Sequence, residues 1–204
     1  MQTELIVFQI IVLIYSVILH EIAHGAAALR FGDKTAQYMG RLTLNPIPHL
    51  DLFGSILLPA LLYYIGSPFL FGWAKPVPVN EANLYPQRLG SFVVSIAGVA
   101  TNFLLAIFFI IFAKFAGSET ISTLCYIGSL TNISLAIFNL IPVPPADGYR
   151  ILENTLPYNL RRGVDAFFAQ YGAMAMILTI PLSILIFRQI FPTIADIVYK
   201  IIFL

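Results

Sequence analysis

The sequence predicts an all-α polytopic membrane protein, a helix bundle of about 4–6 transmembrane segments. Of its 204 residues 59% are apolar and only 10% are charged, and the mean hydropathy is +0.87. A soluble domain is typically about half apolar and about a quarter charged. The apolar excess is concentrated in blocks that each reach the length of about 20 residues needed to span a bilayer, at residues 5–29, 52–74, 89–113, 121–146 and 166–187.

Charge and cysteine content exclude other classes of protein. The net charge is +1 and the longest basic run is the pair Arg161 and Arg162, so we expect no nucleic-acid partner. Cys125 is the single cysteine and cannot form an internal disulfide. The first block is too long for a cleavable signal, and Glu4 stands where a basic region would be expected. We expect residues 1–204 to form a single membrane-embedded domain with no separate soluble domain.

Three ionisable residues lie together inside the first apolar block: His20, Glu21 and His24. A charged group in a membrane helix costs about 2.5–3.5 kcal/mol and needs a compensating interaction. Residues four apart share one face of a helix, so both imidazoles can bind one zinc ion. Glu21 can then reach a water molecule as general base, as in His-Glu-x-x-His metalloproteases. The alternatives are a helix packed against polar neighbours and the proton relay of a transporter.

A catalytic zinc usually has three protein ligands, so a third residue should join His20 and His24. The candidates are His49 and the acidic residues. Asp147 stands out because it closes the segment that runs from Asn139 through three prolines, which break the helix at the end of the fourth block. Broken backbone at membrane depth is tolerated only where protein buries it or it lines a cavity. We therefore favour Asp147, with an ordinary turn leaving the membrane as the alternative.

Two segments, HEIAH and NLIPVPPADGYRIL, resemble the signature motifs of the site-2 protease family of intramembrane zinc metalloproteases, in its compact prokaryotic branch. The intervening RLTLNPIPH, FGWAKPVPVN and SIAGVATN segments are also similar to family sequence, so the resemblance covers roughly residues 15–152. There are two departures from the family pattern. Ala146 replaces the usual leucine, and Val99 follows Gly98 where the family tends to have proline. Neither departure removes a catalytic group.

The resemblance implies a function and a set of site residues. His20, His24 and Asp147 would bind one zinc ion per chain, Glu21 would be the catalytic base, and Asn139 would help to hold the substrate backbone. The activity implied is hydrolysis of peptide bonds in transmembrane protein substrates, as in regulated intramembrane proteolysis. The resemblance also implies that the protein lies in the plasma membrane of a prokaryotic cell.

A single zinc site also constrains the topology. Asp147 must lie at the same depth as the two histidines, and each ligand group lies in the later half of its block. The blocks at 5–29 and 121–146 should therefore run in the same direction, which four alternating crossings do not allow. The conflict is resolved if 52–74, with its three glycines and two prolines, is a re-entrant element.

The distribution of basic residues favours the same topology. Strict alternation divides ten lysines and arginines five and five between the two sides. A re-entrant second block leaves Lys114 and Arg188 on one side and puts eight on the other: Arg30, Lys34, Arg41, Lys75, Arg88, Arg150, Arg161 and Arg162. The positive-inside rule then places the metal ligands toward the cytoplasm.

Residues 41–45 alternate polar and apolar side chains, which is the period of a half-buried strand. We therefore expect a small β-hairpin after the first helix. Its edge can pair with an unwound substrate, because extended peptides often add to the edge of a sheet. The alternative is a hairpin that only caps the bundle. His49 and Trp73 are expected to pack in loops.

Rival functions belong to other classes. A membrane transporter or metal-handling protein would use the His-Glu-His cluster for translocation, but transporters are often built from internal repeats and neither motif has a second copy. A catalytically silent relative would only bind membrane partners. A metalloprotease with a downstream glutamate ligand would use Glu153. The sequence favours an intramembrane zinc metalloprotease.

Overall fold

Helices dominate the computed structural model, which describes residues 2–65 and 73–204. Three helices among these residues are long and apolar enough to cross a membrane: α1 (Gln2–Arg30), α4 (Gln87–Phe115) and α5 (Glu119–Asn139). A 29-residue helix such as α1 is about 43 Å long, more than the bilayer's hydrocarbon core of about 30 Å. The predicted all-α membrane architecture is therefore confirmed, with three candidate spans in the described part of the chain where about 4–6 were expected.

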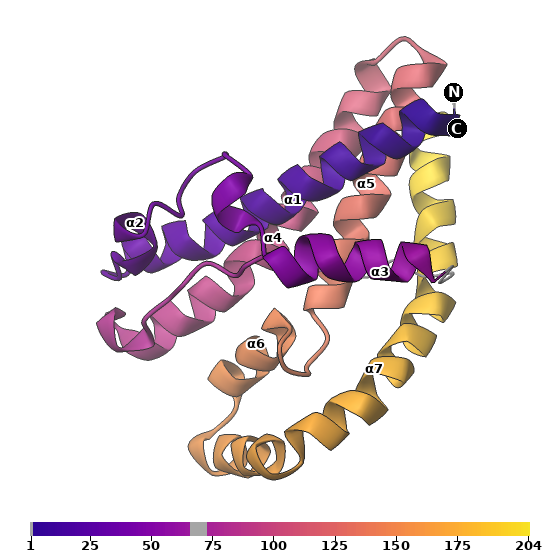
Figure 1. The fold of residues 1–204 in the computed structure, drawn as a ribbon. Coiled ribbons are helices and arrows are strands. Elements are labelled where there is room, and N and C mark those ends of the chain that lie inside the picture. Colours follow the sequence, from indigo (N-terminus) through magenta and orange to yellow (C-terminus); the bar gives the residue numbers. More distant parts are fainter. Residues whose placement is uncertain (1, 66–72) are drawn as a thin grey trace.

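The three spans form one bundle, in which α4 packs against both α1 and α5. In Figure 1, α1 and α5 run in the same direction and α4 runs in the opposite one. A short turn joins α4 to α5. Within it Gly117 has a φ of 59°, a conformation that glycine adopts without strain. The helices approach closely because their buried faces carry small or polar side chains, as is usual between membrane helices. On α4 these include Gly90, Ser91, Ser95, Gly98, Asn102 and Ala106.

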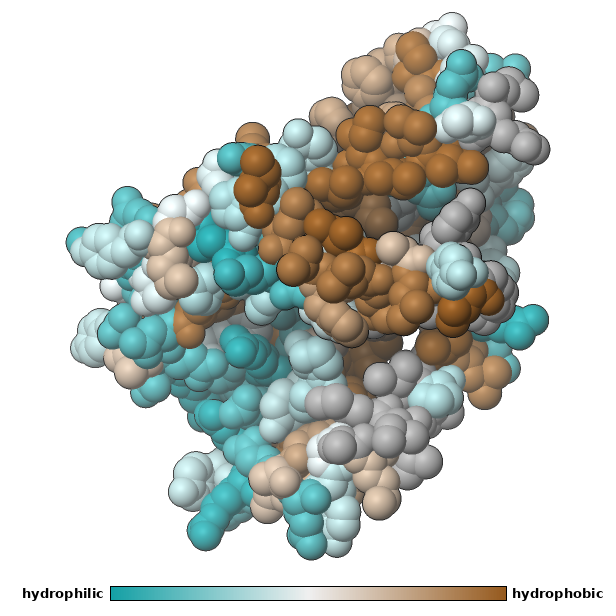
Figure 2. Space-filling view, viewed as in Figure 1, coloured by the Kyte–Doolittle hydropathy of each residue, from teal (hydrophilic) through white to brown (hydrophobic). Residues whose placement is uncertain are grey.

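Apolar side chains cover the outside of the bundle. Figure 2 shows them gathered over the N-terminal half of α1 and over α3 (Leu58–Tyr64), while hydrophilic side chains lie around α2 (Thr35–Tyr38). Large apolar residues on α4, such as Leu104 and Phe108, are also more than half exposed. In water this surface would be costly, so its natural contact is with lipid.

The second apolar block does not form a full span within the described residues. A π-helical segment, η2 (Leu52–Leu57), leads directly into α3, and the two together hold 13 residues. That length is well below the roughly 20 residues that a crossing needs. Residues 66–72, which complete most of the block, lie outside the described residues.

The two ends of the second block lie side by side. The Trp73 amide donates to the Gly54 carbonyl at 3.1 Å, and the Lys75 amide donates to the His49 carbonyl at 2.9 Å. The chain therefore returns to the place where residues 52–74 begin. Adjacent ends are what the predicted re-entrant element requires, and in Figure 1 α1 and α5 run in the same direction, as that topology predicts.

The predicted β-hairpin after the first helix is wrong. In the described part of the chain no residue forms a strand, and residues 41–45 are irregular backbone between α2 and the 3-10 turn η1 (Ile47–His49). Burial runs against the expected pattern, because Arg41 is buried whereas Leu44 is 56% exposed. The alternation of polar and apolar residues therefore does not mark a half-buried strand.

Side chains, and not a neighbouring strand, satisfy the backbone in this region. The Arg41 guanidinium donates to the Lys75 carbonyl at 2.6 Å and to the Pro76 carbonyl at 3.2 Å. The His49 imidazole Nε2 lies 2.9 Å from the Thr43 carbonyl. Period-two sequence reasoning could not foresee that a buried arginine and a buried histidine would take the place of ladder hydrogen bonds.

The last helix, α7 (Tyr158–Phe203), contains the fifth apolar block, at 166–187. It curves along the bundle in Figure 1 and holds Pro181 and Pro192, which remove helical hydrogen bonds and favour bending. Near the end of α7, Val198 joins a hydrophobic cluster with residues of α4 and α5. The C-terminal segment thereby packs against the two spans at the end where they are joined.

Asp33 connects the two ends of the long excursion between α1 and α4. Its side chain is fully buried and accepts hydrogen bonds from the Thr35 amide at 3.1 Å, the Asn80 amide at 2.7 Å and the Asn83 side-chain amide at 3.0 Å. Burial by itself raises the pKa of this carboxyl, but these donors together hold the pKa below its ordinary value. The charged form of Asp33 therefore stabilises the fold.

We expect Asp33→Asn to lower the free energy of unfolding at about pH 7 by about 1–3 kcal/mol. The NH₂ group of the new asparagine would face N–H groups that are themselves donors, so hydrogen bonds to Asp33 would be lost. The stabilisation is present above the pKa of the unfolded carboxyl and is lost as the pH falls through the lower pKa of the folded protein. The difference between the two proteins should therefore shrink on acidification, which thermal unfolding in detergent across a pH series measures.

The matched control is Asp196→Asn, which removes an exposed ion pair with Lys200 on α7. Exposed pairs of this kind contribute about 0.5 kcal/mol or less. Equal unfolding temperatures for Asp33→Asn and the unaltered protein at neutral pH would contradict the role of Asp33.

Candidate metal centre

The site is built from two residues of α1 and the first residue of α6 (Asp147–Thr155). His20 and His24 lie one helical turn apart, are both buried, and have their Nε2 atoms 3.0 Å apart. Asp147 Oδ2 lies 3.1 Å from each of these nitrogens. The structure thus brings together the three residues that the sequence singled out as metal ligands.

A sharp change of direction brings Asp147 to this position. Helix α5 ends at Asn139, and the proline-rich turn that follows leads the chain back into α6. Gly148 makes the return possible, because a Cβ at this residue would overlap the Leu140 carbonyl. The prolines stop one helix and the glycine lets the next pack against its end.

The hydrogen bonds of the imidazoles decide which nitrogen faces the centre. His20 Nδ1 lies 2.7 Å from Asn102 Oδ1, and His24 Nδ1 lies 2.7 Å from the Val94 carbonyl oxygen. Since both of these oxygens accept, each Nδ1 must carry the hydrogen, and each Nε2 presents a lone pair. Asp147 Oδ2 is buried beside them without a hydrogen-bond partner.

Three acceptors thus converge without a donor, an arrangement that a metal cation satisfies. The donor set of two imidazoles and one carboxylate fits zinc with a fourth position open. Tetrahedral ligands with bonds of about 2.0 Å lie about 3.3 Å from one another, close to the separations here. Across the described residues, His20, His24 and Asp147 are the one group of histidine, cysteine or acidic side chains near enough to share a metal.

Gly98 on α4 allows the two histidines to approach that helix. A Cβ at this position would lie 2.5 Å from His20 Cε1 and from His24 Nε2. Sequence reasoning did not assign Gly98, Val94 or Asn102 to the site. The signal for Asn102 was a polar side chain within an apolar block; for a backbone carbonyl such as that of Val94 there was none.

Glu21 lies beside the centre, with its carboxylate turned toward the extended chain that follows the second block. The Val77 amide donates to Glu21 Oε2 at 2.6 Å. This contact holds one carboxylate oxygen and orients the other. The residue is half-buried on α1, next to His20 in sequence but not among the three converging groups.

The remaining candidates lie elsewhere. Asn139 is half-buried at the end of α5, where its side-chain amide donates to the Leu135 carbonyl at 3.0 Å. His49 is buried among loop residues, as expected, and is not part of the metal group. The carboxylate of Glu153, the alternative ligand, pairs with Arg161.

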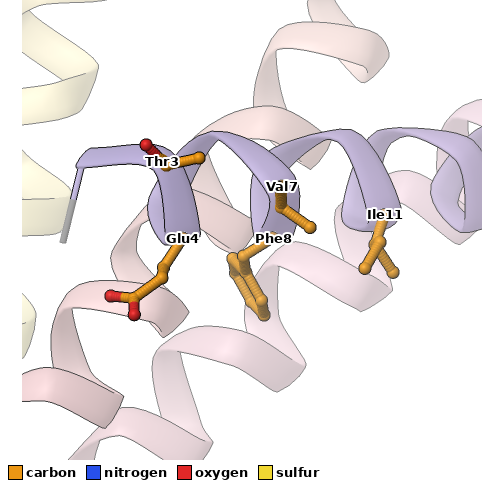
Figure 3. Close-up of a pocket in the computed structure, with 5 residues that line it drawn as sticks. All are labelled: Thr3, Glu4, Val7, Phe8 and Ile11. Atoms are coloured by element: carbon orange, nitrogen blue, oxygen red, sulfur yellow. The ribbon is translucent and has the colours of Figure 1, made fainter.

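A shallow groove of about 330 Å³ on α1 is separate from this centre. It is lined by Thr3, Glu4, Val7, Phe8 and Ile11, near the start of the helix (Figure 3). His20 lies nine positions after Ile11, roughly 14 Å along the helix axis. The groove is mostly apolar and contributes no ligand to the metal group.

Known proteins with similar sequences identify the family. Residues 113–183 match the sequence pattern of peptidase family M50. YwhC of Bacillus subtilis, named as a candidate zinc metalloprotease, is 42% identical over 168 residues, which cover 78% of this chain and 73% of YwhC. The chain belongs to peptidase family M50, the site-2 protease family.

More distant relatives of this M50 chain carry names of the same kind. Rip2 of Mycolicibacterium smegmatis is 31% identical over 79% of the chain, which spans 62% of the length of Rip2. MJ0611 of Methanocaldococcus jannaschii is 29% identical over 72% of the chain and 73% of its own length. No solved structure matches significantly. The predicted family, metalloprotease class and zinc cofactor are confirmed, and the transporter alternative finds no support.

We expect Gly98→Ala to lose most of its zinc, because the added methyl group would occupy the space of both imidazoles. Elemental analysis of the purified protein measures the metal. Gly163→Ala on α7 is the control, since nothing lies within 4 Å of a Cβ there. Normal zinc content in Gly98→Ala would show that α4 does not form the wall of the centre.

Proposed function

We propose that this M50 chain hydrolyses peptide bonds within transmembrane segments of protein substrates. His20, His24 and Asp147 hold one zinc ion and Glu21 is the catalytic base. The observation that carries the proposal is the convergence of three acceptor atoms, without a donor, between membrane-spanning helices. Intramembrane ionisable groups are rare and usually functional.

The residues of the chain divide the chemical work between them. When bound, zinc supplies Lewis-acid chemistry, acidifying water and polarising a carbonyl oxygen. Glu21 accepts a proton from the attacking water and delivers it to the leaving amine. The Val77 amide occupies Glu21 Oε2, which leaves Oε1 for this proton transfer.

The substrate must offer an extended backbone at the centre. In a helix the scissile carbonyl is hydrogen-bonded and shielded by side chains, so the substrate has to unwind locally. Asn139 lies at the last turn of α5, eight residues before Asp147, and its side-chain amide can both donate and accept hydrogen bonds. We assign it the role of holding the freed substrate backbone.

We expect Glu21→Gln to retain zinc and bind substrate while its rate of cleavage falls by about 10²–10⁴-fold, the usual contribution of general acid–base catalysis. Asp147→Asn should behave differently and lose both zinc and activity. Elemental analysis, together with cleavage of a transmembrane reporter in proteoliposomes, separates the two effects.

Glu119→Gln is the control for loss of a carboxylate, since Glu119 lies exposed at the start of α5. It should cleave at the normal rate. Near-normal cleavage by Glu21→Gln would refute the assignment of the base, and unchanged zinc in Asp147→Asn would refute the third ligand.

We further propose that the centre faces the cytoplasmic side of a prokaryotic plasma membrane. The support is the distribution of charge. Arg30 ends α1 and Arg88 lies in the first turn of α4, at the ends nearer to the ligands, whereas Lys114 lies at the opposite end of α4. Excess basic residues mark the cytoplasmic side.

We expect single cysteines at positions 30, 75, 88 and 161 to react with a membrane-impermeant thiol reagent from the cytoplasmic side only. Each is introduced in a Cys125→Ser background, and Lys114→Cys serves as the control for the opposite side. Labelling in intact cells and in inverted vesicles gives the answer. Reaction of positions 75 and 88 from the outside would show that the segment between α1 and α4 lies on the external side, and would contradict the proposed orientation.

A further inference from the structure

A chain of hydrogen bonds leads from one metal ligand across two helices. His20 Nδ1 lies 2.7 Å from Asn102 Oδ1 on α4. Asn102 Nδ2 donates to Asn132 Oδ1 on α5 at 3.1 Å, and Asn132 Nδ2 donates to the Gly128 carbonyl at 3.0 Å. Both asparagines have an exposed fraction of 0%. We call these two residues the amide relay.

The Gly128 carbonyl, which ends this series of hydrogen bonds, fixes the orientation of the side chains before it. The Gly128 carbonyl can only accept, so Asn132 must turn its NH₂ group toward it and its oxygen toward Asn102. Asn102 then turns its own NH₂ group to that oxygen and its Oδ1 to His20. Because Oδ1 also only accepts, His20 must carry its hydrogen on Nδ1.

We propose that Asn102 and Asn132 are positioning residues that hold His20 in the tautomer with a free Nε2 lone pair. The relay transmits the polarity of one backbone carbonyl on α5 to a ligand on α1. Neither asparagine touches the substrate or the metal. The inference rests on the proposed function only in treating His20 as a ligand.

Removal of the second asparagine would free the first. Without Asn132 Oδ1, the NH₂ group of Asn102 has no partner at this depth, and an amide that rotates by 180° can donate to His20 Nδ1 instead. His20 would then carry its hydrogen on Nε2, where it blocks the metal. An unpaired polar group between apolar helices is costly, which favours this rotation.

The second histidine provides an internal control. His24 Nδ1 donates directly to the Val94 backbone carbonyl, so no side-chain amide stands between them. Substitutions in the relay should change the tautomer of His20 and leave that of His24 unaltered. A general loss of structure would affect both rings equally.

The experiment measures the tautomers of the neutral imidazoles by ¹⁵N NMR of histidine-labelled, zinc-free protein in detergent at alkaline pH. The chain has three histidines, so substitution of each assigns the spectrum. The variants are Asn102→Leu and Asn132→Leu. Ser129→Ala is the matched control, because Ser129 is equally buried on α5 but donates to the Tyr126 carbonyl, outside the relay.

We expect the unaltered protein and Ser129→Ala to show His20 protonated on Nδ1. Both leucine variants should show a substantial Nε2-protonated population of His20, with His24 unchanged. Zinc affinity, measured by competition with a chelator, should weaken by about 10–100-fold in each, the usual effect of losing a residue that orients a ligand.

Two results would overturn the proposal. One is an Nε2-protonated His20 in the unaltered zinc-free protein. The other is a pair of folded leucine variants whose His20 tautomer and zinc affinity match those of Ser129→Ala. Since the tautomer is read without metal or substrate, failure here is distinguishable from failure of the proposed protease activity.

Discussion

Three lone pairs directed at one point between membrane helices are the constraint around which this molecule is organised. His20 Nε2, His24 Nε2 and Asp147 Oδ2 lie 3.0–3.1 Å apart, and no donor reaches the carboxylate oxygen. In a medium of low dielectric such a cluster repels itself unless a cation sits among its members. The hydrogen bonds on the far side of each imidazole prevent the rings from turning away. The side chains are therefore already oriented to bind a metal in the metal-free protein. This requirement determines which parts of the chain must lie next to one another.

Most of the fold serves to bring these groups to one depth. Parallel directions for α1 and α5 require an odd number of crossings between these two helices: α4 is one, and the paired ends of the segment at 52–74 are the arrangement expected of a segment that adds none. Glycine has a separate task at two positions: Gly98 lets α4 lie against both imidazoles, and Gly148 lets α6 fold back on the end of α5. Asp33 then closes the excursion that this topology creates.

The sequence predicted the parts of the site that carry unusual chemistry for their surroundings. His20 and His24 were conspicuous because ionisable groups are expensive in a span, and Asp147 because three prolines precede it. Groups that act through geometry were not predictable in this way. The Val94 carbonyl and the Val77 amide are backbone groups with no residue-type signal, and Asn102 gains its role only from its neighbours on two other helices. The hairpin prediction at 41–45 failed for a related reason, since Arg41 and His49 satisfy that backbone from a distance in the sequence.

The wide separation of the ligands along the chain has a consequence for synthesis. About 120 residues lie between His24 and Asp147, so the two proposed histidine ligands enter the membrane long before the proposed third ligand exists. At roughly 5–20 residues per second the interval is roughly 6–25 s. During that time the nascent chain holds an incomplete centre: α4 supplies the carbonyl that orients His24, α5 completes the amide relay that orients His20, and α6 has not been made. With the ligands proposed above, the centre is complete only after α6 has been made and Asp147 has joined the two histidines. The chain therefore cannot cut the helices inserted beside it, its own included, while its spans are still being synthesised.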